Sequence, residues 1–249
     1  PVLFNGGAGD DTFVGGGGSD RFIGSAGHDS LNGGSGGELD WIVAGYNHSI
    51  VDDTLKNIEA VRFYYSGDTI TLTSAQLGSF TQFIHDGSVG QSYRFYLDGG
   101  GAATVNGKFD DADRLVSISG SADADKIAIS PTTKNPVLFN GGAGDDTFVG
   151  GGGADSINGQ AGADTLTGVR GNNVYFGTLA ELAGDTITDF DAFDTLRLES
   201  APFATTAINF IAATNSLRVD LGSNGSIDGV IKLLGTFQGT FVKQVGPGG

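Results

Sequence analysis

The sequence contains no cysteine and no methionine, and it has only one tryptophan, three histidines and five prolines in 249 residues. The absence of cysteine excludes disulfide bonds, thiolate metal sites and a cysteine nucleophile. No apolar run approaches the length of a transmembrane segment, and no N-terminal stretch has the pattern of a signal peptide. Because the chain starts at proline and lacks methionine, we expect a fragment or a processed product.

Basic residues are also scarce, since 13 Lys and Arg stand against 29 Asp and Glu, giving a formal net charge of −16. Nucleic acid is therefore not expected as a partner, because phosphate binding needs clustered Lys and Arg. An acidic chain can instead bind cations, and about six calcium ions would cancel roughly 12 of these charges. Glycine is abundant at 44 residues, while 39% hydrophobic content and 17 Phe favour a folded core over disorder.

A segment of 18 residues, PVLFNGGAGDDTFVGGGG, occurs at residues 1–18 and again without change at residues 136–153. Each copy opens an array of nine-residue repeats with the pattern G-G-x-G-x-D-x-U-x, where U is a large apolar residue. The first array comprises Gly6–Val14, Gly15–Ile23, Gly24–Asn32 and a degenerate repeat from Gly33 that carries two extra residues. The second comprises Gly141–Val149, Gly150–Asn158, Gly159–Thr167 and the decayed repeat Gly168–Phe176.

The spacing of each repeat predicts a turn of six residues followed by a strand of three, with the U side chain pointing inward. Such short strands cannot bury a face alone, so successive coils must stack into a β-solenoid. Two repeats make one coil, which places the turns of repeats n and n+2 on the same edge. The inward residues are then Phe13, Phe22, Leu31, Phe148, Ile157 and Leu166.

Stacking brings the sixth residues of alternate repeats together, and these residues are acidic. The expected pairs are Asp11 with Asp29, Asp20 with Asp40 or Glu38, Asp146 with Asp164, and Asp155 with Asn173. Stacked carboxylates repel one another, and a hard cation with turn carbonyls in its shell removes that repulsion, which suits Ca²⁺ better than zinc or copper. The predicted metal residues are Gly6, Ala8, Asp11, Gly15, Gly17, Asp20, Gly24, Ala26, Asp29, Asp40, Asp125, Gly141, Ala143, Asp146, Gly150, Gly152, Asp155, Gly159, Ala161 and Asp164.

The arrays resemble those of the RTX (repeats-in-toxin) proteins, closely over about a third of the chain and more loosely elsewhere. The resemblance implies an all-β fold with parallel β-roll arrays, Ca²⁺ bound in the turns, and export by a type I secretion system to the outside of the cell. The turn aspartates of the family map onto the sixth residues named above. Asn173 and the Glu38 or Asp40 alternative depart from the pattern, which leaves the last site of each array in doubt.

The segment between the arrays, residues 42–119, shows strand signals at Val61–Tyr65, Thr69–Thr73, Tyr93–Leu97 and Leu115–Ser119. The short segments Ser74–Phe80 and Thr178–Ala183 are the helix candidates. Gly120–Ala128 resembles a lone degenerate repeat, with Asp125 at its sixth position and Ile127 at the U position, or else is an ordinary surface turn. The sequence GDTIT follows each array, at Gly67 and at Gly184, which suggests duplicated modules at residues 1–135 and 136–249.

Acidic residues after the second array, Asp185, Asp189, Asp191 and Asp194, are expected to be solvated turn residues, with a further ion or a cap as the alternative. Asp220–Asp228 has part of an EF-hand spacing but lacks the acid at position 12. A hairpin turn at Asn224 and Gly225, between strands Leu217–Leu221 and Val230–Leu234, explains it more simply. The apolar tail Gly235–Val245 is where the resemblance places a secretion signal.

Motifs of catalysis are not apparent, since the chain lacks H-E-x-x-H, G-x-S-x-G and a phosphate-binding loop. We therefore expect a calcium-binding structural module without catalysis. Its parent protein could be an adhesin or S-layer protein, an exported hydrolase with an upstream catalytic domain, or a carbohydrate-modifying enzyme such as a mannuronan epimerase. Glycans or a cell surface are further candidate partners. Six aromatic residues could line a contact surface for a sugar or a protein, with strand packing as the simpler explanation: Trp41, Tyr46, Tyr64, Tyr65, Tyr93 and Tyr96.

Overall fold

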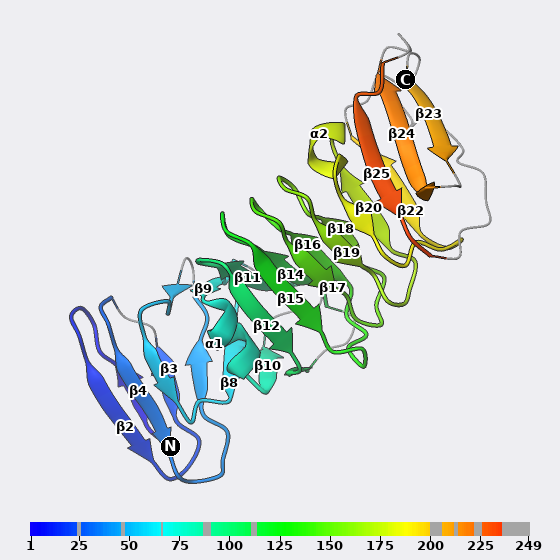
Figure 1. Ribbon diagram of the computed structural model, residues 1–249. Helices are drawn as coiled ribbons and strands as arrows, with labels where there is room; N and C mark the ends of the chain where they lie inside the picture. Colours follow the sequence, from blue (N-terminus) through cyan, green and yellow to red (C-terminus); the bar gives the residue numbers. More distant parts are fainter. Residues whose placement is uncertain are drawn as a thin grey trace.

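The computed structural model describes residues 1–23, 26–45, 48–65, 67–86, 91–110, 114–199, 206–211, 214–221 and 226–235. These residues form an all-β parallel β-solenoid of about nine turns with almost no helix. The coils follow one another from the N-terminal end to a hairpin at the C-terminal end (Figure 1). The expected fold class is therefore confirmed, and the segment between the arrays is itself part of the solenoid.

Two sheets form the N-terminal coils, and all of their ladders are parallel. Sheet 1 has six strands in the order β1 (Leu3–Asn5), β3 (Arg21–Ile23), β5 (Trp41–Val43), β8 (Ala60–Phe63), β10 (Gln82–His85) and β13 (Lys108–Phe109). Sheet 2 has three strands in the order β2 (Thr12–Gly16), β4 (Ser30–Gly34) and β7 (Thr54–Lys56).

Two eight-stranded sheets form the C-terminal coils. Sheet 3 runs in the order β22 (Thr195–Leu198), β20 (Val174–Gly177), β18 (Ser156–Asn158), β16 (Val137–Asn140), β14 (Val116–Ser119), β11 (Tyr93–Leu97), β9 (Ile70–Leu72) and β6 (His48–Ser49). Sheet 4 runs in the order β12 (Gly101–Val105), β15 (Asp125–Ile129), β17 (Thr147–Val149), β19 (Thr165–Thr167), β21 (Thr186–Ile187), β25 (Gly229–Leu233), β24 (Ser216–Leu221) and β23 (Thr206–Ile211).

The two short helices lie where the sequence predicts them. Helix α1 (Ser74–Ser79) and helix α2 (Leu179–Leu182) each begin at a threonine, Thr73 and Thr178, whose hydroxyl accepts a hydrogen bond from the backbone of the third helical residue. Helix α1 packs on β12, and its Gln76 side chain donates hydrogen bonds to the carbonyls of Ile50 and Asp53, just before β7. Helix α1 therefore takes the place of a strand between sheets 2 and 4.

The number of strands in a coil changes along the chain. The first coils have two strands, from sheets 1 and 2, and the middle coils have three, as in β10–β11–β12 and β13–β14–β15. After β13 sheet 1 ends, and the next coils again have two strands, now from sheets 3 and 4. The two arrays are thus built on different pairs of sheets within one solenoid.

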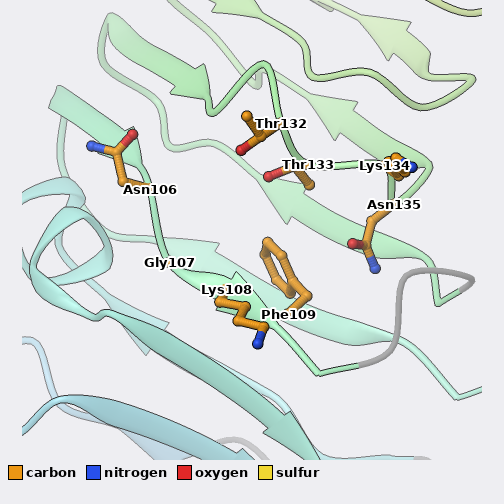
Figure 2. A pocket seen from close by; sticks show the side chains of 8 residues that line it. All are labelled: Asn106, Gly107, Lys108, Phe109, Thr132, Thr133, Lys134 and Asn135. Atoms are coloured by element: carbon orange, nitrogen blue, oxygen red, sulfur yellow. The ribbon is translucent and has the colours of Figure 1, made fainter.

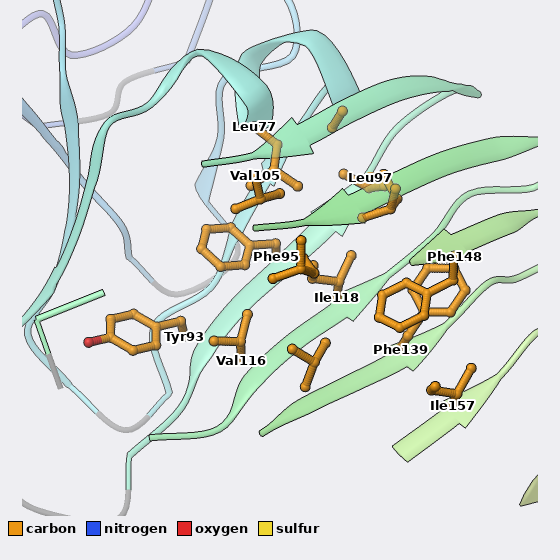
Figure 3. Close-up of a cluster of buried hydrophobic side chains, with 14 of the residues drawn as sticks. Leu77, Tyr93, Phe95, Leu97, Val105, Val116, Ile118, Phe139, Phe148 and Ile157 are labelled. Carbon is orange, nitrogen blue, oxygen red and sulfur yellow. The ribbon is translucent and has the colours of Figure 1, made fainter. Parts of the chain in front are cut away.

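The core is a column of apolar side chains that lies between the sheets, and Figure 3 shows its middle part. On sheet 3 the register stacks Phe95, Ile118, Phe139, Ile157 and Tyr175 on one another, and all five are buried. On sheet 4 the facing column is Ala103, Ile127, Phe148, Leu166 and Ile187. This one-residue-per-coil column explains why each repeat needs a single large apolar residue.

Strand pairing continues across the boundary between the two predicted modules, since β14 pairs with β16 and β15 with β17. The division at residues 135 and 136 thus remains a prediction from the duplicated sequence. At the C-terminal end, β24 pairs antiparallel with β25 as the hairpin prediction requires, whereas Asn224 and Gly225 lie outside the described residues. The tail from residue 236 onward also lies outside them. No described helix is long and apolar enough to cross a membrane.

Candidate metal centre: the aspartate ladders of the turns

The sixth residue of each well-formed repeat is buried where the turn enters the strand. Asp20, Asp29, Asp146, Asp155 and Asp164 are each at most 2% exposed, and Asp11 in the first coil is partly exposed. Carboxylates are seldom buried so completely unless a hydrogen bond, an ion pair or a metal ion compensates for the lost water. Both oxygens of each carboxylate therefore need a partner, either from the turn or from a bound ion.

Apart from Asp11, each sixth-position carboxylate of the two arrays accepts a backbone N–H from the preceding coil with its Oδ1. The Oδ1 of Asp29 accepts from the N–H of Asp11 at 3.0 Å, and the Oδ1 of Asp164 accepts from that of Asp146 at 2.8 Å. The other expected pairs are present too, with Asp20 N–H to Asp40 Oδ1 at 2.6 Å and Asp155 N–H to Asn173 Oδ1 at 3.0 Å. These bonds tie successive turns into ladders along each edge.

The second oxygen is left without a hydrogen-bond partner in several turns. The Oδ2 atoms of Asp11, Asp20, Asp146, Asp164 and Asp185 are buried and accept no hydrogen bond. An unpartnered buried polar group costs about 1–3 kcal/mol, and a charged one costs more. These five oxygens are the strongest structural indication that another group belongs in the turns.

The glycine at the first position of the repeat leaves room beside that oxygen. A methyl group on Gly141 would lie 2.2 Å from Asp146 Oδ2 and 2.5 Å from the carbonyl oxygen of Gly159 in the next coil. Gly15 has the same surroundings, with Asp20 Oδ2 at 2.0 Å and the Gly33 carbonyl at 2.5 Å. A carboxylate oxygen and a carbonyl oxygen therefore converge on a space that only glycine keeps open.

Burial makes the charged form of these carboxyls unfavourable. It raises the pKa of Asp146, Asp155 and Asp185 to about 7, and it raises the pKa of Asp164 as well. The neighbouring Asp164 carboxylate adds to the effect at Asp146. At neutral pH a cation between the turns would favour the ionised form of these groups.

The donor set fits a hard cation that accepts carbonyl ligands. Among the described residues, no group of three or more His, Cys, Asp or Glu side chains converges as a site for a metal ion. A metal in the turns would thus be held by one or two aspartates together with glycine and alanine carbonyls, an all-oxygen set that suits Ca²⁺. Parallel bridges between Ala8 and Ala26, and between Ala143 and Ala161, hold the third positions of alternate repeats in register.

The structure decides between Glu38 and Asp40, and it distinguishes Asp125 from the other predicted metal residues. Asp40, rather than Glu38, continues the ladder from Asp20. Asp125 is in register with the second array, but its Oδ2 accepts from Ser121 N–H and Oγ at 2.8 and 3.0 Å, so that oxygen already has partners. Gly24 lies outside the described residues. The metal-binding roles of the predicted residues stay predictions.

Three further acidic residues belong to the ladders, although the repeat pattern did not predict them there. The Oδ1 of Asp185 accepts from Asp164 N–H at 3.0 Å, that of Asp53 from Asp29 N–H at 3.0 Å, and Glu59 Oε2 from Asp40 N–H at 3.0 Å. The available signal was spacing, because Asp185 follows Asp164 by 21 residues, the same interval that separates Asp125 from Asp146. Coils can lengthen by a few residues without leaving register.

The expectation of solvated acids after the second array was wrong for Asp185, which is fully buried. Asp191 is a turn residue, because its Oδ1 accepts from Phe193 N–H in the same turn at 2.7 Å, whereas Asp189 and Asp194 act as caps. Asp189 accepts from the N–H groups of Gly168 and Val169 and from the Tyr175 hydroxyl, and Asp194 accepts from Asn173 N–H at 3.0 Å. These bonds provide acceptors for backbone N–H groups in the degenerate last repeat of the second array.

The aromatic candidates divide into core and surface. Tyr93 is buried in the core, whereas Tyr65 and Tyr96 are 76% and 47% exposed. Trp41 and Tyr64 are half-buried beside sheet 1, and Tyr46 lies outside the described residues. The simpler explanation, strand packing, therefore holds for Tyr93 but not for the whole set.

Comparison with known families agrees with this geometry. The family model of the RTX calcium-binding nonapeptide repeat (4 copies) matches residues 5–37 and residues 140–175. The matches coincide with the two arrays and with the turns that carry the aspartate ladders. No curated protein sequence matches the chain.

Proposed function

We propose that this chain, built on two arrays of RTX calcium-binding repeats, is a module that binds Ca²⁺ in its turns and requires the ion to fold. The observation that carries the proposal is the set of buried Oδ2 atoms without hydrogen bonds, four of which, those of Asp11, Asp20, Asp146 and Asp164, lie next to the first glycine of a turn. When bound, Ca²⁺ supplies positive charge to groups that burial otherwise neutralises. The protein itself orients the carboxylates through the Oδ1 hydrogen bonds and keeps the turns open with glycine.

The expected gain in stability is large compared with that of a domain. A ligand that binds only the folded state stabilises it by RT ln(1 + [L]/Kd), or about 1.4 kcal/mol per site at tenfold excess over Kd. Six independent sites would contribute roughly 8 kcal/mol, which is comparable to the whole stability of an ordinary domain. Without the ion, the net charge of −16 and the buried carboxyls oppose folding.

The same dependence suits a protein that is exported unfolded and folds outside the cell. Calcium is too scarce in a cytosol to occupy the turns, so the chain stays disordered there and orders at extracellular calcium concentrations. The RTX repeats support a secreted or cell-surface location and export by type I secretion machinery. In this proposal the chain is a structural module and catalyses no reaction.

Circular dichroism of the chain in EDTA, followed by titration with Ca²⁺ and separately with Mg²⁺, tests the proposal. We expect a disordered spectrum in EDTA and a β spectrum in millimolar Ca²⁺ but not Mg²⁺, with calorimetry giving several ions per chain. A β spectrum that is unchanged by EDTA would disprove calcium-dependent folding.

A matched pair of variants localises the sites. Asp146→Asn removes a charge from a buried ladder position, and Asp123→Asn removes one from an exposed turn position. We expect Asp146→Asn to lower the calcium stoichiometry and raise the calcium concentration at the folding midpoint severalfold, whereas Asp123→Asn leaves both nearly unchanged. Equal effects would show that only net charge matters.

A further inference from the structure

The outer face of sheet 1 carries an aromatic and cationic patch that the calcium sites do not use. The patch consists of Arg21, Ile23, Trp41, Val43, Arg62 and Tyr64, which lie on β3, β5 and β8 or directly after β8. The register places Arg21 beside Trp41, and Val43 between Ile23 and Arg62. Strand alternation points these side chains away from the core residues Phe22, Ile42 and Val61.

The two arginines of the patch are held against aromatic rings. The Arg62 guanidinium carbon lies 4.9 Å from the centre of the Trp41 ring, and that of Arg21 lies 5.0 Å from the centre of the Tyr64 ring. Such contacts fix the planar guanidinium while leaving some of its N–H groups for a ligand. The patch is thus ordered before any partner binds.

The charges of the patch are only partly balanced. Arg62 forms an ion pair with Asp86, whose Oδ2 lies 2.9 Å from its Nε. Arg21 makes no ion pair with a described residue, and its Nε and the Nε1 of Trp41 are buried without a hydrogen-bond acceptor. In a chain with a net charge of −16, an unpaired arginine among aromatic rings is complementary to an anion.

A further cationic residue lies beyond the patch, in the same row of sheet 1 as Trp41. In the register of sheet 1, Trp41 is followed by Ala60, Gln82 and Lys108. Lys108 lines a cavity of about 210 Å³ together with Lys134, Thr132 and Asn135, at the place where sheet 1 ends (Figure 2). Neither lysine forms an ion pair with a described residue. Ala60 is fully buried, so the accessible groups of this row are Arg21 and Trp41 at one end and Gln82 and Lys108 at the other.

We propose that this face of sheet 1 binds a linear anionic polysaccharide, whose sugar units lie along the solenoid axis with their carboxylates towards Arg21 and Lys108. Adjacent parallel strands are about 4.8 Å apart, close to the length of one sugar unit, so side chains in register can meet successive sugars. Trp41 and Tyr64 hold the two guanidinium groups in place, and arginine binds planar carboxylates through two N–H groups. Nucleic acid fits less well, because the acidic remainder of the chain repels phosphates.

Titration calorimetry in saturating Ca²⁺ with a purified hexa-uronate, too short to form calcium gels, tests this site. The comparison ligands are a neutral glucan hexamer and a polyglutamate of equal charge. We expect measurable binding of the uronate, and binding at least tenfold weaker or undetectable for the other two. Failure of the uronate to bind, or equally tight binding of polyglutamate, would overturn the proposal.

Variants place the binding on sheet 1. Arg21→Gln and Trp41→Ala should each weaken uronate binding at least tenfold, and Lys108→Gln should weaken it severalfold. The matched controls are Arg94→Gln and Tyr96→Ala, which remove an exposed arginine and an exposed tyrosine from the outer face of sheet 3. They should change the affinity less than twofold. Equal losses on both faces would refute a site on sheet 1, and dichroism in Ca²⁺ verifies that each variant is folded.

Discussion

The two copies of the 18-residue segment have the same sequence but differ in their surroundings. In the N-terminal copy, Phe4, Asp11 and Phe13 are all partly exposed, whereas the equivalent Phe139, Asp146 and Phe148 are at most 1% exposed. The paired rings are nevertheless alike, with centroids 4.6 Å apart in the first copy and 4.4 Å apart in the second. Sequence thus dictates how a coil is built, and its neighbours dictate how deeply it is buried.

The cause is the number of neighbouring coils. Strands β1 and β2 pair only with β3 and β4, while β16 and β17 have a strand on each side. The Oδ1 of Asp146 accepts from Asp125 N–H at 2.8 Å, but no described residue donates to the corresponding oxygen of Asp11. A repeat therefore gains most of its burial, and one hydrogen bond of its ladder, from the coil before it.

The largest difference between the copies should appear when a core ring is removed. Phe148→Ala should destabilise the calcium-bound protein by about 3–5 kcal/mol, as expected for a fully buried phenylalanine, and Phe13→Ala by about half as much or less. Denaturant unfolding in saturating Ca²⁺ measures both. Equal losses would mean that the first coil is as well packed in solution as the internal one.

A smaller difference is expected for the first glycine of the repeat. Gly141→Ala places a methyl group 2.2 Å from Asp146 Oδ2 and 2.5 Å from the rigid Gly159 carbonyl, so we expect a cost of about 1–3 kcal/mol and weaker calcium binding. In Gly6→Ala the near contacts are side-chain atoms of Asp11 and Phe4, which can move, so the cost should be smaller. Calcium titrations of the two variants, followed by dichroism, compare them. A milder effect at Gly141 would contradict this account.

The smallest effect concerns pH and the buried carboxyls of the internal array. Because burial raises the folded-state pKa of Asp146, Asp155 and Asp185 to about 7, their neutral forms stabilise the calcium-free fold below pH about 4, and this stabilisation is lost as the pH rises through about 7. Calcium binding requires deprotonation, so its affinity should change in the opposite direction and tighten between pH 5 and pH 8.

Two measurements separate these opposite trends. Residual structure in EDTA should be greater at pH 4.5 than at pH 8, and the calcium midpoint should fall as the pH rises. Asp146→Asn should reduce both dependences, with Asp123→Asn as the control of equal charge change. A calcium midpoint independent of pH would show that the turn carboxyls are already ionised without the ion.

Much of the candidate site could be predicted because the aspartates recur at a fixed interval along the chain. With two repeats per coil, residues 18 positions apart must stack, and this places Asp29 on Asp11 and Asp164 on Asp146. Ladder members separated by longer intervals, such as Asp53 and Asp185, were missed because coils of unequal length have no fixed period. Whether an aspartate already has partners for its second oxygen, as Asp125 has in Ser121, depends on contacts that the repeat pattern does not encode.

The repeat, the inward apolar column, the two capped helices and the pairing of the turn aspartates follow from the amino-acid sequence alone, because each depends on spacing along the chain or on a local capping residue. The replacement of sheets 1 and 2 by sheets 3 and 4 depends on how the coils stack in three dimensions, and so does the deeper burial of one copy of an identical segment. The tertiary structure also brings together Arg21, Trp41, Arg62 and Tyr64, which come from three successive coils. Stacking of coils creates such outer surfaces, and no single repeat contains them.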